Sequence, residues 1–370
     1  MSRYYITGSE ARALRRLSRR LPGVSLDPVD ECTIEPLDHR WNKHDTNCIE
    51  EIRNVLGLGY GRPISLRVPS AADRLRSSCV CSSVCSVELP KGSFLRLDIS
   101  DSSMVSLPDD AEVLVDSPML SFATAAHQLN GLVARQSMQS YEADIRLVAM
   151  AAEECGHYAL NPWKPREGDC KYKLPEIMTV DGLATYLKEL HGLDGMARAK
   201  RAASLAFDRS DSPMETFVNA GLSLPVTHGG LFLGPPVANK RIDLSDLQQL
   251  MLNHRDHITP DLLWEAWSII VEYLGREPHE GQAAQDEDMG RVQDYQVLGY
   301  LVFPITYKHV HNPQSFNELA VRIATAMEQK GSFGACAQLA LLLSDQAFLE
   351  RQSCLFKVML PAVARDGQAC

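Results

Sequence analysis

Two neighbouring apolar runs within ITPDLLWEAWSIIVEYLG, residues 258–275, constrain most strongly what this chain can fold into. Both runs are rich in the aromatic and β-branched residues that strands prefer, and few residues separate them. The pattern predicts an antiparallel hairpin of strands 261–266 and 268–273. Asp261 begins the first strand and Glu272 lies near the end of the second, so we expect the two carboxylates to be neighbours.

The hairpin belongs to a longer series of predicted elements. Before it, SPMETFVNAGLSL predicts a helix with Ser212 as its N-cap, and NKRIDLS predicts a short strand. After it, QDEDMGRVQDYQVLGY predicts a helix and YLVFPITY a strand that Pro304 places at a sheet edge or a bulge. The resulting order, αβββαβ, is that of the common core of restriction-endonuclease-like folds. We therefore expect an α+β protein in which this C-terminal core follows a mixed β-rich and helical region.

The segments before this core predict a different organisation. Four short runs rich in β-branched residues lie between residues 61 and 120, and four helical patterns follow them. We expect five parts along the chain: a small mixed N-terminal segment at 1–60, a β-rich domain at 61–135, a helical connector at 136–205, the endonuclease-fold domain at 206–327 and C-terminal helices at 328–370.

Composition is typical of a globular protein, with 45% apolar and 23% charged residues. No run of eighteen apolar residues is present, so no membrane span is expected. The N-terminus lacks the apolar stretch of a secretory signal, which predicts a cytoplasmic protein with its ten cysteines reduced. The net charge of -10 means that any contact with nucleic acid must be local.

The densest basic stretch is ARALRRLSRRLPG, which carries leucines at helical spacing. Two interpretations of this predicted helix remain open. One is a helix face in contact with solvent. The other is an arm that contacts the DNA backbone through its arginines. These arginines are Arg12, Arg15, Arg16, Arg19 and Arg20.

Three acids in the C-terminal region have the residue types that a metal-dependent nuclease needs. Phosphodiester hydrolysis uses divalent cations to stabilise the attacking and leaving oxygens, and Mg2+ prefers oxygen ligands. Glu215, Asp261 and Glu272 come from three separate predicted elements. Each also has a simpler interpretation: Glu215 completes a capping box with Ser212, Asp261 is a turn residue and Glu272 an exposed strand end. Their joint occurrence in this order of elements favours a metal site.

The same region resembles the Vsr-like domain of unknown function found in actinobacterial proteins, within the PD-(D/E)xK endonuclease superfamily. The resemblance covers about residues 206–327 and rests on a Ser-Pro-x-Glu helix start, a Glu-Tyr strand end and an Asp-x-x-Arg helix that ends at Gly-aromatic. The matching residues are Glu215, Asp261, Glu272, His279, Asp288, Arg291, Gly299 and Tyr300. A weaker resemblance to AbiEi-type antitoxin-like regulators covers segments upstream of this domain.

The resemblance implies a role for each matching polar residue. Glu215, Asp261 and Glu272 would bind Mg2+, His279 would assist proton transfer and Arg291 would contact the phosphate of DNA. The chain departs from the family pattern at Leu274, where the family has an acid after Glu-Tyr. Leucine can neither ligate a metal nor orient water.

Two functions are therefore expected. The first is a DNA-acting defence or regulatory protein with a Mg2+-dependent deoxyribonuclease domain, either active or weakened at Leu274. The second is a non-enzymatic, antitoxin-like transcriptional regulator that uses the nuclease fold as a scaffold and has a toxin or another regulatory protein as its partner. Three retained acids favour the first function, and Leu274 favours the second.

Overall fold

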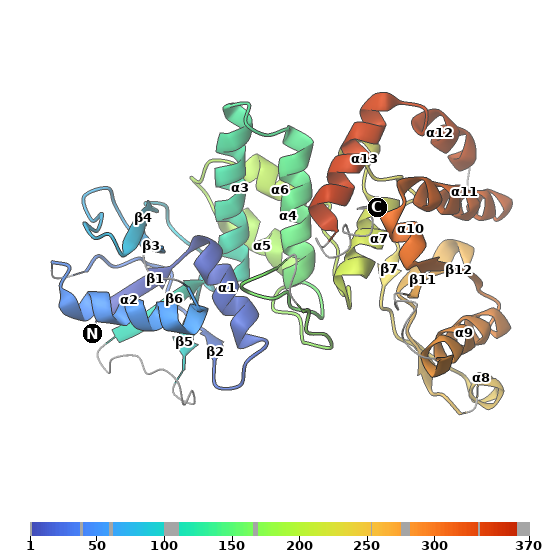
Figure 1. The fold of residues 1–370 in the computed structure, drawn as a ribbon, viewed down its shortest axis with the longest axis horizontal. Coiled ribbons are helices and arrows are strands. Elements are labelled where there is room, and N and C mark those ends of the chain that lie inside the picture. Colours follow the sequence, from blue (N-terminus) through green and yellow to red (C-terminus); the bar gives the residue numbers. More distant parts are fainter. Residues whose placement is uncertain are drawn as a thin grey trace. The chain divides into compact units, whose positions relative to one another are not determined.

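The computed structural model describes residues 2–37, 40–58, 62–99, 111–165, 169–252, 254–274, 282–331 and 334–360, with the side chains of 282–288 and 335 left out. The chain is α+β and divides into two compact units (Figure 1). Unit 1 comprises Met1–Ala143 and Ala159–Ala206, and unit 2 comprises Asp144–Tyr158 and Phe207–Cys370. In the described residues no helix is long and apolar enough to cross a membrane.

Unit 1 is built on a six-stranded sheet with the strand order β2-β5-β6-β1-β3-β4. Strands β1 and β6 are parallel, as are β3 and β4, and the remaining neighbours are antiparallel. The strands span Ser2–Ile6 (β1), Ser25–Pro28 (β2), Ile64–Val68 (β3), Val80–Val84 (β4), Phe94–Asp98 (β5) and Ala111–Asp116 (β6). The four β-rich runs predicted between residues 61 and 120 are thus confirmed as β3 to β6.

Helices cover one face of this sheet and form a further group beside it. Helices α1 (Gly8–Ser18) and α2 (Lys43–Leu56) bury their apolar stripes against one face, which alternating strand residues such as Tyr4 and Ile6 provide. Helix α3 (Pro118–Ala134) packs against α1 and also against α5 (Val180–Glu189) and α6 (Met196–Ala203). Helix α4 spans Ser140–Glu154.

The structure groups the N-terminal part of the chain differently from the expected five segments. Strands β1 and β2 share one sheet with β3 to β6, so residues 1–60 and 61–135 do not form separate parts. Sequence patterning could not show this, because strand pairing over long sequence separations depends on the completed sheet.

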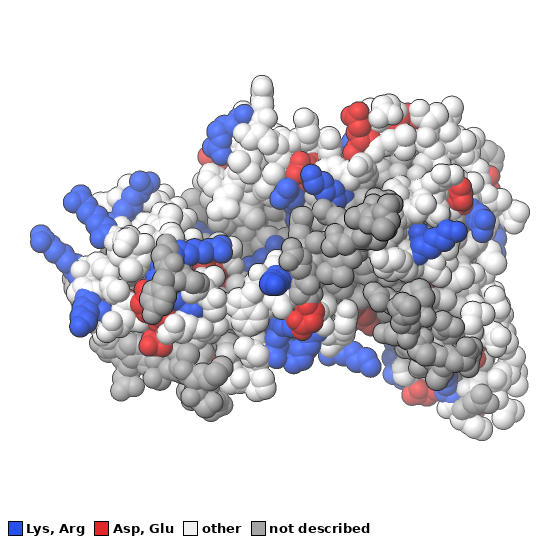
Figure 2. Space-filling view, viewed as in Figure 1, with Lys and Arg blue, Asp and Glu red and all other residues white. Residues whose placement is uncertain are grey.

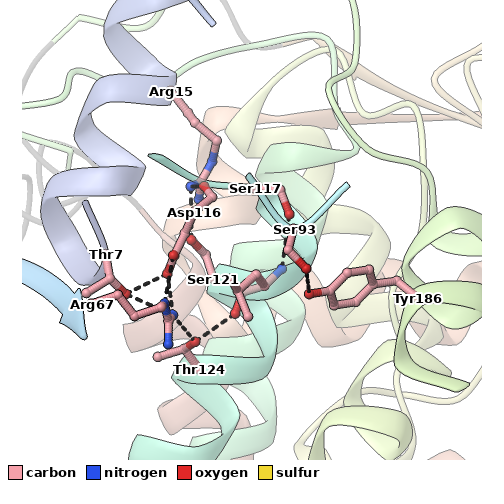
Figure 3. Close-up of polar contacts among 10 residues, drawn as sticks. Thr7, Arg15, Arg67, Ser93, Asp116, Ser117, Ser121, Thr124 and Tyr186 are labelled. Atoms are coloured by element: carbon pink, nitrogen blue, oxygen red, sulfur yellow. Dashed lines mark hydrogen bonds and ion pairs between the residues drawn. The ribbon is translucent and has the colours of Figure 1, made fainter. Parts of the chain in front are cut away.

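A buried polar network joins the ends of β3 and β6 to helices α1 and α3 (Figure 3). The Arg67 Nε donates to Asp116 Oδ1 at 2.9 Å, and Arg67 Nη2 donates to Thr124 Oγ1 at 2.7 Å. The Thr7 hydroxyl also donates to Asp116. Burial lowers the pKa of Arg67, but the Asp116 carboxylate raises it by more, so the net shift is upward. The Asp116 charge is therefore compensated by an arginine and by hydroxyl groups.

The basic helix of the sequence is α1, and its arginines interact within unit 1. Arg15 is only 1% exposed and donates to the Asp116 carbonyl at 2.7 Å and to Ser121 Oγ at 2.9 Å. The expected contact of Arg15 with DNA is therefore wrong, because its guanidinium lies in the protein interior. Arg19 donates to the Pro175 carbonyl, and Arg20 forms an ion pair with Asp169.

The four other arginines that could contact DNA are half-buried: Arg12, Arg16, Arg19 and Arg20. Their contact with DNA stays a prediction. On the face drawn in Figure 2, Lys and Arg side chains stand at separate places with Asp and Glu side chains between them.

Unit 2 contains a four-stranded sheet with the order β12-β11-β10-β7. Its strands span Val237–Ala238 (β7), Leu262–Trp264 (β10), Ile269–Leu274 (β11) and Leu301–Thr306 (β12). Strands β10 and β11 form the predicted antiparallel hairpin, which turns through the 3-10 helix η2 (Glu265–Trp267). Strand β12 pairs with β11 in parallel and lies at the sheet edge, as Pro304 predicts.

Helices α7 (Pro213–Ser223) and α9 (Gln282–Val297) appear where the sequence predicts them. The short strand expected in NKRIDLS is present as β8 (Ile242–Asp243), but it does not join the sheet of the hairpin. The strand that pairs with β10 is β7, just before that segment, whereas β8 pairs with β9 (His257–Ile258) in a separate ladder. Helix α8 (Asp246–Met251) connects β8 and β9.

The C-terminal helices are α10 (Tyr307–His311), α11 (Pro313–Gln329), α12 (Ala335–Leu342) and α13 (Gln346–Met359). Helices α12 and α13 are separate, because Asp345 caps α13 by accepting from the Ala347 amide at 2.9 Å. Helix α7 packs against α13, where Phe217, Phe316 and Phe356 form a cluster of tilted and edge-on rings. This packing fixes the helix that carries Glu215.

We predict that Asp116→Ala lowers the free energy of unfolding of unit 1 by about 3–5 kcal/mol, because it leaves the buried Arg67 charge without its partner. Asp169→Ala is the matched control, since it removes the acid of an exposed ion pair in the same unit and should change stability little. Urea-induced unfolding followed by circular dichroism measures both variants. Equal effects of the two substitutions would show that the Asp116 network does not stabilise unit 1.

Candidate functional site

Asp261 and Glu272 lie opposite each other across the β10–β11 hairpin. The register pairs Leu262 with Val271 and continues outward to these two acids. The Asp261 amide donates to Glu272 Oε1 at 3.1 Å, and the Tyr273 amide donates to Asp261 Oδ2 at 2.6 Å. Residues directly opposite on antiparallel strands share a face. The two carboxylates are thus neighbours, as the hairpin pattern predicts.

Glu215 reaches the same place from the first turn of α7. Ser212 caps this helix by accepting from the Glu215 amide at 3.1 Å. The Glu215 Oε2 accepts from the Asp211 amide at 2.9 Å, one residue before the N-cap, so the expected reciprocal bond to Ser212 is shifted. The helix cap and the acid cluster therefore use the same carboxylate.

Asn239 connects Glu215 to the hairpin, and sequence patterning did not single it out. Its Nδ2 donates to Glu215 Oε2 at 2.8 Å, and its amide donates to the Asp261 carbonyl at 3.0 Å. Its φ is +43°, a left-handed conformation that asparagine adopts more readily than most residues. An asparagine just after a short strand was the only signal in the sequence.

Burial and mutual repulsion dominate the electrostatics of the three acids. Burial, followed by the charges of Glu272 and Glu215, raises the pKa of Asp261 well above its usual value. Burial raises the pKa of Glu272 to about 7, and the charge of Arg291 acts in the opposite direction. Burial also raises the pKa of Glu215, against the hydrogen bond from Asn239. The cluster therefore holds protons more tightly than exposed carboxylates do.

Helix α9 supplies the other groups that face the cluster. Arg291 Nη1 lies 3.6 Å from Glu272 Oε2 and is the ion-pair partner of that carboxylate. Tyr295 donates its hydroxyl hydrogen to the Thr259 carbonyl at 3.3 Å, and burial together with the Glu272 charge raises the pKa of this phenol. The sequence pattern identified Arg291 but missed Tyr295.

Three further positions of the resemblance remain to be located in the structure: His279, Asp288 and Leu274. His279 lies outside the described residues, as does the side chain of Asp288. Leu274 is half-buried and packs against the cluster of apolar residues formed by Leu263, Ile270 and Val292. The position where the family has an acid is thus part of the apolar core beneath α9.

The donor chemistry of the cluster fits Mg2+, because all three candidate ligands are carboxylate oxygens. Glu272 is fully buried, and within the part of the chain that the structure describes its Oε2 accepts no hydrogen bond, with Arg291 Nη1 3.6 Å away. Yet within the residues described, no group of three or more His, Cys, Asp and Glu side chains is arranged to hold a metal ion. Glu215 Oε2 and Asp261 Oδ2 accept hydrogen bonds from nitrogen donors instead. Binding would require these carboxylates to exchange those donors for the cation.

Comparison with known proteins finds no match to this chain among protein-family models, curated proteins or solved structures.

The raised pKa of Glu272 predicts how stability depends on pH. Between the ordinary value of 4.5 and about 7, the folded protein binds this proton and the unfolded chain does not. Stability should therefore fall as pH rises through this window, by up to roughly 1.4 kcal/mol per pH unit. Glu272→Gln, which cannot ionise, should reduce the slope.

Urea unfolding at pH 5 and pH 7 in the presence of a chelator measures this slope. Glu265→Gln is the matched control, because Glu265 is exposed on the same hairpin. A slope in Glu272→Gln as steep as that of the control would contradict the prediction.

Proposed function

We propose that unit 2 contains a restriction-endonuclease-like domain that acts on DNA, with Glu215, Asp261 and Glu272 as a weak site for Mg2+. One observation carries the proposal: three buried carboxylates from α7, the start of β10 and the end of β11 come together, and among the described residues Arg291 opposes their charge. Strongly perturbed acids of separate elements are typical of functional sites. A divalent cation would relieve their repulsion.

The element order of unit 2 supports the same proposal. From α7 to β12 the sheet and its helices follow the order α7, β7, β10, β11, α9, β12, which is the αβββαβ order expected of this superfamily. Helix α9 makes the crossover between the parallel strands β11 and β12. The element order and the Vsr-like motifs support phosphodiester hydrolysis as the class of reaction, and the three acids support this end of the hairpin as its site.

Each residue of the proposed site would have a distinct role. When bound, the cation would lower the pKa of water and stabilise the oxygens of a phosphodiester. Glu215, Asp261 and Glu272 would hold it, while Asn239 orients Glu215. Arg291, whose side chain is 34% exposed, lies beside the cluster where a DNA phosphate would meet its guanidinium.

A second candidate function is a non-enzymatic regulator that uses this domain to bind DNA or a protein such as a toxin. Leu274 supports it, because an apolar side chain occupies the position of the family's acid and packs into the core. The hydrogen bonds from backbone and Asn239 to the carboxylates also support it, since they satisfy oxygens that a cation would need.

We predict that the wild-type protein binds Mg2+ or Mn2+ weakly, with a Kd of roughly millimolar, and cleaves DNA slowly or not at all. Leu274→Asp adds a carboxylate two residues after Glu272 on the same strand face. It should tighten cation binding by about tenfold. Glu272→Ala in the Leu274→Asp background should remove the gain.

Calorimetric titration with each cation and a cleavage assay on plasmid and single-stranded DNA measure these effects. Glu265→Ala is the control, because it removes an exposed acid from the same hairpin and should leave cation affinity unchanged. Efficient cleavage by the wild type would show that Leu274 does not impair the nuclease activity. Absence of both binding and cleavage in Leu274→Asp would reject the metal site and favour the non-enzymatic function.

A further inference from the structure

The segment at the end of α4 is fastened to the loop that precedes α7, although more than fifty residues separate them in the chain. The His157 amide donates to the Ser210 carbonyl at 2.8 Å, and the Arg209 amide donates to the Cys155 carbonyl at 3.0 Å. Gly156 permits this approach, because an added Cβ would lie 2.9 Å from the Ser210 carbonyl oxygen. Two backbone hydrogen bonds and a required glycine thus fix the position of His157.

The His157 side chain continues this contact toward the acid cluster. Its Nδ1 lies 2.6 Å from Asp211 Oδ1. An ionised carboxylate can only accept, so Nδ1 is the donor. The amide of the same Asp211 donates to Glu215 Oε2 at 2.9 Å. A series of hydrogen bonds therefore leads from His157 through Asp211 to the third acid of the candidate site.

Asn239 holds the same loop from the other side. Its Nδ2 donates both to the Arg209 carbonyl at 2.7 Å and to Glu215 Oε2 at 2.8 Å. Arg209 has a φ of +66°, a left-handed conformation that a non-glycine residue keeps only when its surroundings impose it. The loop is held in this form by contacts with both His157 and Asn239.

We propose that His157 is a positioning residue of the acid cluster: through Asp211 it holds the loop so that Glu215 is presented to Asp261 and Glu272. This inference rests on the proposed function, because the cluster is the candidate cation site. Without the His157 bond, Asp211 and its amide are released, and Glu215 loses one of its two orienting donors outside its own helix.

The chain offers a matched pair elsewhere in unit 2. His257 Nδ1 lies 2.6 Å from Asp256 Oδ1, the same atoms at the same distance. His257 begins β9 and Asp256 precedes it, and neither residue hydrogen-bonds to the three acids. This pair therefore separates the general effect of losing a His–Asp pair from the specific effect on Glu215.

The test compares His157→Ala, His157→Asn and His157→Gln with His257→Ala by hydrogen–deuterium exchange of the peptide covering 209–216 in the metal-free protein. The Asn amide nitrogen occupies nearly the position of Nδ1, whereas that of Gln corresponds to Nε2. We expect exchange to be roughly tenfold faster in the Ala and Gln variants. His157→Asn should restore wild-type exchange, and His257→Ala should leave this peptide unchanged.

Calorimetric titration with Mn2+ supplies the second measurement, with an expected affinity loss of about fivefold in His157→Ala and recovery in His157→Asn. Unchanged exchange in His157→Ala, or failure of His157→Asn to restore it, would overturn the inference, as would unchanged Mn2+ affinity. If the Ala variant does not fold, the difference between the Asn and Gln variants decides. If the proposed function is wrong, the wild type binds no Mn2+. Hydrogen–deuterium exchange of the peptide 209–216 still shows in that case whether His157 positions the loop that orients Glu215.

Discussion

A carboxylate buried at the end of a β-strand must be compensated by positive charge, by hydrogen-bond donors or by a proton, and this constraint acts in both units. In unit 1, Asp116 receives an arginine and hydroxyl groups, with Arg15 bound to its carbonyl. In unit 2, Asp261 and Glu272 face each other with Glu215 beside them, and Arg291 is the one cation among the causes of their pKa shifts. The first arrangement is satisfied, and the second has excess negative charge.

This difference separates a structural network from a candidate functional site. The Asp116 network joins β3, β6, α1 and α3, so its expected contribution is to the stability of unit 1. In the acid cluster, burial and mutual repulsion of the carboxylates raise their pKa values, and one Glu272 oxygen accepts no hydrogen bond from the described residues. Such an arrangement reduces stability near neutral pH unless a cation or a ligand compensates it.

The surroundings of the cluster determine which function this excess charge can serve. Leu274 contributes packing near the end of β11, and the donors from Asp211, Asn239 and Tyr273 occupy oxygens of the acids. These features fit a weak site better than a tight one. His157 belongs to the same surroundings, because it fixes the loop from which Glu215 is oriented.

The sequence by itself determined most of the local structure. Apolar runs rich in aromatic and β-branched residues, the Ser212 cap and the position of Pro304 predict α7, the β10–β11 hairpin and the edge strand β12, because these depend on residues close in sequence. The pairing of Asp261 with Glu272 follows from the hairpin for the same reason. The choice of three acids could thus be made from residue type and element order.

Only the tertiary structure decided what these residues meet. It buried Arg15, which helical spacing could equally assign to solvent or DNA, since burial depends on elements that pack against the helix from elsewhere in the chain. It also brought Asn239, Tyr295 and His157 to the acids or to the loop that orients them. No local pattern specifies such contacts, because strand pairing and loop closure create them between residues distant in sequence.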